Sequence, residues 1–272
     1  IGLFRSEFIY LDNSTIPTLE QQSKVLQEIT KKFTGTIVYR TLDIGGDKQV
    51  DYLNLPIEEN PFLGVRGIRL SLGNLELFDS QIKSILISES LERIKIMFPM
   101  ISTIEDYIEA KAFVTKVAKE LNVEAPPMGI MVETPASAFI ADKFSEIVDF
   151  ISIGTNDLTQ YIMAADRGNS NLGHYQDPLH PAVLKAISNV IDCSDKNNIE
   201  VSVCGEMSSD PVAAFALYVL GLKTFSMAPS AAPFVFDVLN THSKINKALI
   251  KETILSQKNA DEIRTAIQEI IS

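Results

Sequence analysis

The feature that most constrains the fold is a regular alternation of short apolar runs with helical patterns. The runs predict strands at Ile1–Phe4, Thr36–Tyr39, Gly67–Ser71, Ile94–Met100, Met128–Val132, Phe150–Ile153, Val201–Val203 and Thr224–Met227. Helical periodicity lies between them, at Leu19–Phe33, Glu76–Ser90, Ile104–Asn122, Ala136–Phe144, Ala182–Asn197 and Pro211–Leu220. Eight strands alternating with helices predict an α/β fold, a (β/α)8 TIM-type barrel. An open doubly wound sheet is the competing architecture.

Helix starts are marked in the sequence by proline and by capping residues. Proline stands where a first helical turn would begin at Pro135, Pro181 and Pro211. Ser102 and Asp210 are candidate N-caps. Neither an internal repeat nor a linker is evident, so we expect a single domain over residues 1–272.

One gap between strand ends is much longer than the others. It separates Gly154 from Cys204, and its excess lies between Asn156 and Pro181. Long loops inside compact domains are usually functional or disordered, so we expect this one to serve a site.

Bulk composition narrows the class of protein. The chain has 24 Lys and Arg against 35 Asp and Glu, a net charge of −11, which argues against nucleic-acid binding. Two cysteines are too few for a disulfide framework or a thiolate zinc site, and we expect a reducing, cytoplasmic location. The most apolar segment, Ala213–Leu222, is too short to insert into a membrane. The chain begins at Ile1 without Met, so we expect it to be a fragment of a longer protein.

Polar residues gather where the predicted strands end. They are Arg5, Arg40, Arg66, Arg69, Glu133, Asn156, Asp157 and Cys204, with Arg167 in the long loop. Residues at the C-terminal ends of barrel strands face the active site. Arginines fit phosphates and carboxylates, two carboxylates suit a Mg²⁺ that shares its ligands with a phosphorylated substrate, and a thiol can move protons.

Each of these residues also has a structural interpretation. An arginine after a strand can form a surface ion pair, and Glu133 can favour the positive end of the next helix. Cys204 can be a small buried hydrophobe, as we expect for Cys193, and Asp43–Lys48 can be a glycine turn. A structural role is also the stronger expectation for His180.

Eight ordered segments of the chain carry a family resemblance. They are Gly2–Phe8, Arg40–Lys48, Asn60–Arg66, Met97–Met100, Gly129–Pro135, Ser152–Tyr161, Asp166–Asn169 and Cys204–Met207. With them the chain resembles the C-terminal, phosphoenolpyruvate-binding domain of enzyme I of the bacterial sugar phosphotransferase system. That family transfers the phosphoryl group of phosphoenolpyruvate to a histidine and leaves pyruvate.

The resemblance implies roles for individual residues. The metal ligands would be Glu133 and Asp157, holding Mg²⁺. The substrate-binding residues would be Arg5, Arg40 and Arg167 on the phosphoryl group, Asn156 beside them, Arg66 near the enol oxygen, Lys48 as a weaker phosphate ligand, and backbone amides around Leu158 for the carboxylate. Cys204 would be the catalytic general acid that protonates the enolate of pyruvate.

The resemblance also implies partners that this chain lacks. In enzyme I the phosphorylated histidine sits in an N-terminal domain, in a setting that His174, His180 and His242 do not share. We therefore expect this fragment to need that phosphohistidine domain, which passes phosphate on to HPr for sugar uptake. The resemblance also implies a homodimer.

Three other functions remain open on sequence grounds. A pyruvate phosphate dikinase or phosphoenolpyruvate synthase domain would perform the same half-reaction beside a nucleotide-binding domain. A non-catalytic module could sense phosphoenolpyruvate, although binding alone would not require Cys204. A Mg²⁺-dependent lyase or aldolase barrel would account for the arginines and carboxylates but not for Asp43–Lys48.

Overall fold

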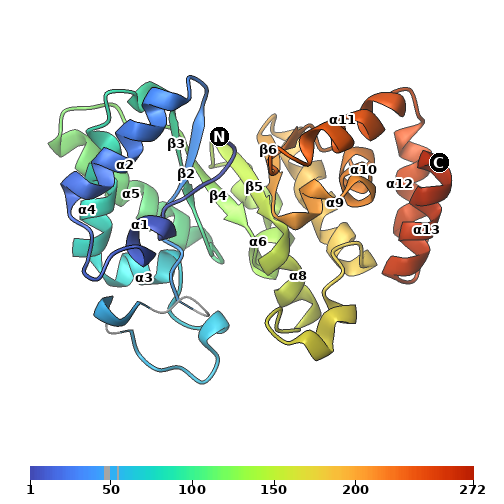
Figure 1. The fold of residues 1–272 in the computed structure, drawn as a ribbon, viewed down its shortest axis with the longest axis horizontal. Coiled ribbons are helices and arrows are strands. Elements are labelled where there is room, and N and C mark those ends of the chain that lie inside the picture. Colours follow the sequence, from blue (N-terminus) through green and yellow to red (C-terminus); the bar gives the residue numbers. More distant parts are fainter. Residues whose placement is uncertain (46–49, 54) are drawn as a thin grey trace. The chain divides into compact units, whose positions relative to one another are not determined.

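The computed structural model describes residues 1–45, 50–53 and 55–272. They form two compact units, the first of residues 1 and 3–131 and the second of residues 2 and 132–272. Helices and strands alternate in both (Figure 1). Whether the chain acts as a single domain stays a prediction.

The first unit is built on parallel strands. Each pairs with the next in chain order: β1 (Phe4–Arg5), β2 (Ile37–Arg40), β3 (Ile94–Phe98) and β4 (Met128–Val132), whose last residue opens the second unit. The helices are α1 (Glu7–Leu11), α2 (Leu19–Lys32), α3 (Ile68–Gly73), α4 (Leu75–Leu86) and α5 (Ile104–Glu120), with 3₁₀ turns η1 (Asp51–Leu53), η2 (Pro61–Leu63) and η3 (Leu91–Arg93). Arg5 is level with Arg40, and Arg40 with Met97, so the strands end at a common edge.

A buried glutamine fixes that edge to the helices of the first unit. Gln81 of α4 donates to Ser6 Oγ after β1 at 3.2 Å and accepts from the Leu42 amide after β2 at 3.0 Å. A hydrophobic core cluster of this unit includes Ile9, Leu42 and Leu70. Because the side-chain nitrogen and oxygen of Gln81 each form a hydrogen bond, the loops that follow β1 and β2 have a defined position.

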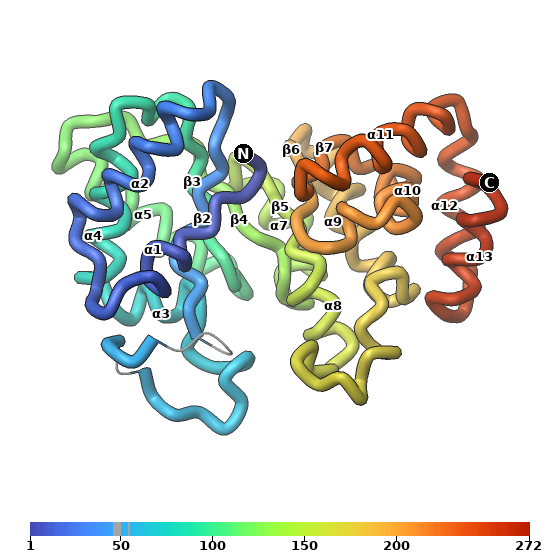
Figure 2. The backbone as a smooth tube through the Cα atoms, viewed as in Figure 1, coloured from blue at the N-terminus to red at the C-terminus, as the bar shows by residue number. Residues whose placement is uncertain are grey.

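The second unit repeats the pattern with β5 (Phe150–Gly154), β6 (Glu200–Cys204) and β7 (Thr224–Phe225), paired in parallel. Its helices are α6 (Pro135–Phe139), α7 (Ala141–Phe144), α8 (Thr155–Met163), α9 (Pro181–Lys196), α10 (Pro211–Val219), α11 (Ala232–Thr241), α12 (Lys247–Ser256) and α13 (Ala260–Ile271), with 3₁₀ turns η4 (Ser170–Tyr175) and η5 (Glu206–Ser209). Every residue of β5 is buried, as is typical of strands covered on both faces. Helix α10 packs against α12 and α13, the last two helices in the sequence (Figure 2).

Seven of the eight predicted strands overlap an observed strand, although Ile1–Phe4 shares only Phe4 with β1. The described residues hold seven strands, because Gly67–Ser71 is not a strand and Ile68–Gly73 forms α3. Gly67 has a φ of +60°, which turns the chain, and its carbonyl then accepts from the Ser71 amide at 3.1 Å. A short apolar run fits a buried helix as well as a strand, so periodicity could not decide. The helix expected at 136–144 is two short helices, α6 and α7.

The helix starts were mostly predicted correctly. All three prolines occupy first turns, in α6, α9 and α10. Asp210 caps α10, accepting from the Val212 amide at 2.8 Å. The Ser102 prediction was wrong: Thr103 is the cap of α5, forming a reciprocal capping box with Asp106.

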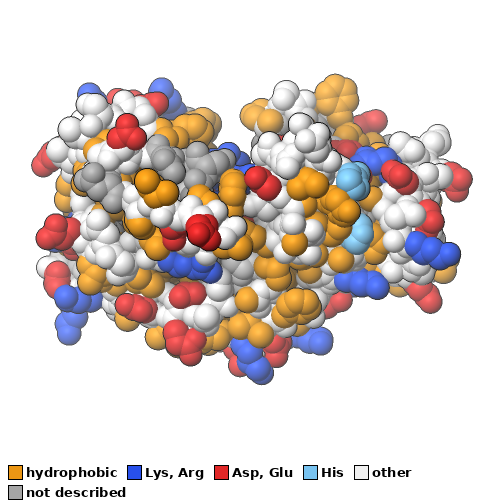
Figure 3. Space-filling model, turned by 90° about the horizontal axis from the view of Figure 1, so that it is seen from below, with side chains coloured by type: hydrophobic (Ala, Val, Ile, Leu, Met, Phe, Trp, Pro, Cys, Tyr) orange, Lys and Arg blue, Asp and Glu red, His pale blue; other side chains and the backbone are white. Residues whose placement is uncertain are grey.

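The surface agrees with the acidic composition. On the face drawn in Figure 3, acidic and basic side chains are interspersed, without an extended basic area among the described residues. Such a surface does not favour phosphate backbones. In the described part of the chain, no helix combines the length and apolar character needed to cross a membrane.

Candidate active site

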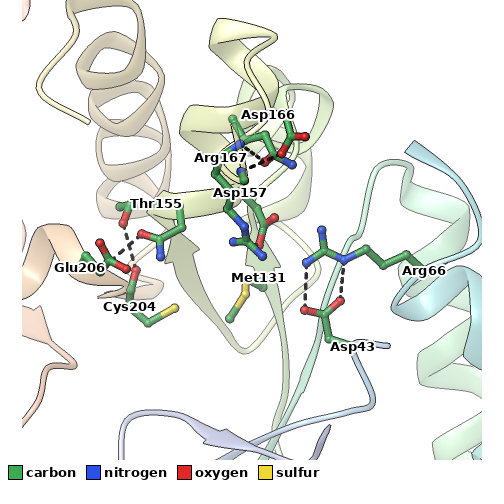
Figure 4. Close-up of polar contacts among 12 residues, drawn as sticks. Asp43, Arg66, Met131, Thr155, Asp157, Asp166, Arg167, Cys204 and Glu206 are labelled. Carbon is green, nitrogen blue, oxygen red and sulfur yellow. Dashed lines mark hydrogen bonds and ion pairs between the residues drawn. The ribbon is translucent and has the colours of Figure 1, made fainter. Parts of the chain in front are cut away.

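A buried ion-pair cluster lies after β2 in the first unit. The Asp43 carboxylate accepts from Arg66 Nε at 3.0 Å and Arg66 Nη2 at 3.1 Å, and it pairs with Arg40 Nη1 at 3.1 Å (Figure 4 shows Asp43 and Arg66). The exposed fractions are 1% for Asp43, 1% for Arg66 and 5% for Arg40. Bidentate pairing of this kind fixes the plane of a guanidinium.

Glu7 completes this cluster from the start of α1. It is 2% exposed and accepts a short hydrogen bond from Arg40 Nη2, while Arg40 Nη1 also contacts Met131 Sδ at 3.5 Å. In these contacts, two arginines therefore face two carboxylates. On sequence grounds Glu7 had no separate role, and a glycine turn was the structural interpretation of Asp43–Lys48. The available signal was their place inside the Gly2–Phe8 and Arg40–Lys48 segments.

The remaining basic candidates of the first unit lie in different settings. Arg5 is exposed at the end of β1, and among the described residues its side chain makes no hydrogen bond or ion pair. Arg69 donates to the carbonyls of Leu63 and Gly64 at 3.0 and 3.2 Å, so it stabilises the loop that contains these two residues. Lys48 lies outside the described residues.

The second unit contains the two predicted metal ligands. Glu133, directly after β4, is 0% exposed, and Asp157, in the first turn of α8, is 7% exposed. Thr134 separates Glu133 from the next helix and caps it, accepting from the Ser137 amide at 3.2 Å. The cap for α6 is therefore a hydroxyl, which leaves capping as a weak explanation for Glu133.

The donor set of the second unit can be tested against a metal. Among the described residues, no group of three or more His, Cys, Asp and Glu side chains is placed to hold an ion. Two buried carboxylates remain. Two carboxylates are too few for structural zinc, whereas carboxylate oxygens are the type of ligand that Mg²⁺ prefers.

The side chains of Arg167 and Asn156 belong to the same part of the second unit as Asp157. Arg167 Nη1 lies 3.5 Å from Asp157 Oδ2, and the Arg167 amide donates to Gln160 Oε1 at 2.9 Å (Figure 4). Asn156 Oδ1 accepts from the Glu206 amide at 3.3 Å, which orients its side chain. The amides of the first helical turn, up to Leu158, carry the positive end of the α8 dipole. Anions are favoured at such a position.

Cys204 ends β6 at the level of Gly154, where β5 ends. It is 4% exposed; its Sγ accepts from Ser152 Oγ at 3.6 Å and donates to the Ile153 carbonyl at 3.5 Å. The register of these two parallel strands therefore places a thiol beside the turn that carries Asn156 and Asp157.

Gly205 allows the chain to turn immediately after this thiol. Its φ is +111° and its ψ is −179°, a conformation that is essentially restricted to glycine. A Cβ here would lie 2.5 Å from Thr155 Oγ1 and 3.0 Å from Asn156 Oδ1. Thr155 Oγ1 in turn donates to the Cys204 carbonyl at 3.2 Å.

The other cysteine and the histidines lie in structural settings. Cys193 is buried on α9, and burial raises its pKa, with the charge of Asp142 adding to the effect. His180 Nδ1 accepts from the Ala182 amide at 3.2 Å, which caps α9. His242 Nδ1 lies 2.8 Å from the Val238 carbonyl, and His174 packs on a neighbouring tyrosine ring at 3.9 Å.

Comparisons with known proteins show the family to which the chain is similar. The family model described as PEP-utilising enzyme, PEP-binding domain matches residues 1–243. The phosphoenolpyruvate-protein phosphotransferase of Bacillus subtilis is 41% identical over 277 residues, covering 99% of this chain and 48% of that protein. Its counterpart in Haloferax volcanii is 45% identical over 245 residues, covering 86% and 43%. The chain thus spans about half the length of these curated relatives.

Solved structures support the fold. The malate synthase of Haloferax volcanii in a pyruvate and acetyl-CoA ternary complex has a TM-score of 0.52 and 16% identity, covering 93% of this chain and 66% of that chain. The same enzyme in a magnesium and glyoxylate complex also has a TM-score of 0.52, at 14% identity. At these identities the likeness concerns the fold alone. The α/β, TIM-barrel class expected from the sequence is confirmed.

Proposed function

This chain belongs to the family of phosphoenolpyruvate-utilising enzymes, through their phosphoenolpyruvate-binding domain, and we propose that it prepares phosphoenolpyruvate for phosphoryl transfer to a histidine. The observation that carries the proposal is the aligned ends of β5 and β6 in the second unit. There a buried carboxylate with its arginine follows one strand, and a buried thiol ends the other. These are the groups that a metal-assisted reaction ending in enolate protonation requires.

We infer that Glu133 and Asp157 hold a Mg²⁺ ion. Both carboxylates are buried, and buried charges in proteins are paired or bind metals. When bound, the ion would neutralise charge on the substrate's oxygens as the bond between phosphorus and the bridging oxygen loosens.

Arginines and amides would orient the substrate. In the second unit, Arg167 and Asn156 stand beside Asp157, and the first-turn amides of α8 near Leu158 suit a carboxylate. In the first unit, Arg5 and Arg40 are our candidates for phosphoryl contacts, Arg66 for the enol oxygen, and Lys48 as an additional ligand. Glu7 and Asp43 would hold the guanidinium planes of Arg40 and Arg66 in place.

Cys204 is the proposed general acid. After the phosphoryl group moves to the histidine nitrogen, the bridging oxygen keeps the bonding pair and the enolate of pyruvate remains. The Cys204 thiol then gives its proton to the methylene carbon, forming the methyl group of pyruvate and a thiolate. Ser152, which donates to Sγ at 3.6 Å, would stabilise that thiolate.

The phosphoryl acceptor would come from outside this chain. His180 and His242 accept or share hydrogen bonds with their own helices, and His174 packs on a ring. We therefore propose an N-terminal phosphohistidine domain of the same enzyme as acceptor. HPr would receive the phosphate from it for sugar uptake, and the enzyme would be a cytoplasmic homodimer.

Titration calorimetry with phosphoenolpyruvate, with and without Mg²⁺, tests the binding half of the proposal. We expect heat of binding only when Mg²⁺ is present. Equal binding without the metal would contradict the assignment of Glu133 and Asp157, and absence of binding under both conditions would refute the proposed function.

Deuterium exchange into the methyl group of pyruvate tests the chemical half without the acceptor domain. With Mg²⁺ in heavy water, the chain should exchange these protons, because the Cys204 thiolate can remove one and return a deuteron. Cys204→Ala should abolish exchange while keeping phosphoenolpyruvate binding, and Cys193→Ala is the matched control that should change neither. Retained exchange in Cys204→Ala would show that another group moves the proton.

A further inference from the structure

The segment that carries Arg167 is attached to the second unit mainly by polar contacts. Ala165 is 3% exposed at its start and Leu179 is 0% exposed at its end. All of residues 166–178 are described, and none of them is buried. Because no apolar side chain of this segment enters the core, hydrogen bonds and ion pairs must set its position.

Two glutamines hold the turn around Arg167. Gln160 of α8 accepts from the Arg167 amide at 2.9 Å. Gln176 Nε2 donates to the Asp166 carbonyl at 2.8 Å and to the Asn169 carbonyl at 3.5 Å. Gln176 therefore ties the far end of the segment, next to Asp177, to the turn that contains Arg167.

Arg264 of the last helix, α13, holds that far end. Its Nη2 lies 3.2 Å from Asp177 Oδ2, and its Nη1 lies 3.2 Å from Asp210 Oδ2. Asp177 Oδ1 also accepts from the Leu179 amide at 2.9 Å, and Asp210 caps α10. Burial alone would lower the pKa of Arg264, but hydrogen bonds to Asp177 and Asp210 outweigh it and raise the pKa, so the guanidinium stays charged.

A cavity of about 420 Å³ lies between these groups. Asn156, Arg167, Gln176, Asp210 and Arg264 are among the residues that line it. The segment therefore faces a hollow rather than packed side chains on this side, and it can shift if its polar ties are lost.

We propose that Arg264 is a positioning residue, which holds Arg167 in its binding geometry through Asp177 and Gln176. Arg264 lies beyond residues 1–243, the part matched by the family model. The inference rests on the proposed function for the role of Arg167. The link from α13 to Asp177 rests on contacts within the second unit alone.

Hydrogen exchange without substrate tests the tether. In Arg264→Gln, amides of residues 166–178, including the Arg167 amide, should exchange several-fold faster than in the unaltered chain. Lys251→Gln is the matched control: Lys251 pairs with Asp192 at 2.7 Å, linking α12 to α9 without touching the segment. Unchanged exchange in Arg264→Gln, or equal acceleration in both variants, would overturn the inference.

Phosphoenolpyruvate binding with Mg²⁺ tests the route through Arg167. Arg264→Gln should weaken binding about threefold to tenfold, because the binding-competent arrangement is less populated. Arg264→Lys keeps the positive charge but loses the two-pronged guanidinium geometry, so its affinity for phosphoenolpyruvate should lie between those of the unaltered chain and Arg264→Gln. In an Arg167→Gln background, Arg264→Gln should change binding less than about twofold, since coupled residues are not additive.

The outcomes separate the two proposals. Equal fold losses in both backgrounds would show that Arg264 acts independently of Arg167 and would overturn the inference. If the unaltered chain fails to bind phosphoenolpyruvate, the proposed function fails. The exchange of the Arg167 amide then still decides whether Arg264 positions that residue.

Discussion

Replacing Asp43 with Asn should destabilise the first unit strongly. The Asp43 carboxylate contacts Arg66 at 3.0 and 3.1 Å and Arg40 at 3.1 Å, and all three side chains are at least 94% buried. Asn has nearly the same shape and keeps one acceptor oxygen. The substitution therefore removes little volume but takes away the negative charge that both Arg40 and Arg66 contact.

The size of the expected stability loss in Asp43→Asn follows from the burial of the ion pairs. Removing one partner of a buried pair leaves an uncompensated charge and typically costs about 3–5 kcal/mol of unfolding free energy. The Asp79–Lys83 pair of α4, with an N–O distance of 2.6 Å, offers a contrast because both side chains are about one-third exposed. Water screens that pair, so Asp79→Asn should have a much smaller effect.

Urea unfolding followed by circular dichroism measures both variants. Asp43→Asn should lower the urea concentration at the midpoint of unfolding far more than Asp79→Asn does. The double variant Asp43→Asn with Arg66→Met should lose less unfolding free energy than the sum of its single changes, because the two side chains contact each other and their effects are coupled. Equal effects of Asp43→Asn and Asp79→Asn would refute the idea that this buried ion-pair cluster stabilises the edge.

Three further predictions concern the second unit. Gly205→Ala should lower the free energy of unfolding by about 1–3 kcal/mol in thermal or urea unfolding, because its backbone conformation is restricted to glycine. Gly173→Ala, with open space around it, should leave that free energy nearly unchanged. Similar losses in both variants would contradict the backbone strain at Gly205. Asp157→Asn should raise the Mg²⁺ concentration needed for phosphoenolpyruvate binding about tenfold or more by calorimetry, and an unchanged requirement would remove Asp157 from the metal site. In a Cys204→Ser chain, Cys193 should react slowly with a disulfide reagent at neutral pH and faster only above the ordinary thiol pKa. The reason is that the raised pKa of Cys193 lowers its thiolate fraction. A reaction rate near that of free cysteine at pH 7 would contradict the burial of Cys193.

Much of the fold was predictable because strand signals are local. The predicted and observed bounds of Met128–Val132 are identical, and Phe150–Ile153 differs from β5 by one residue. The failure at Gly67–Ser71 also has a local cause. Both structures suit its apolar residues, and the positive φ of Gly67 decided for a helix.

The candidate site was predictable in its residues more than in its contacts. Polar residues after apolar runs identified Glu133, Asp157 and Cys204, and the structure places each of them at a strand end or first turn. What these side chains touch was not predictable. Arg40 is three positions before Asp43, but nothing in the sequence indicates that the same carboxylate also holds Arg66.

The sequence by itself determined the order of strands and helices, the proline-marked helix starts and the chemical inventory at the strand ends, since these depend on residues a few positions apart. Only the tertiary structure decided which charges pair. Asp43 meets Arg66 across 23 positions and Asp177 meets Arg264 across 87, because packed helices and strands bring distant segments together. Local propensity carries no record of such contacts, and the partners of a buried charge decide whether it stabilises a fold or serves a site.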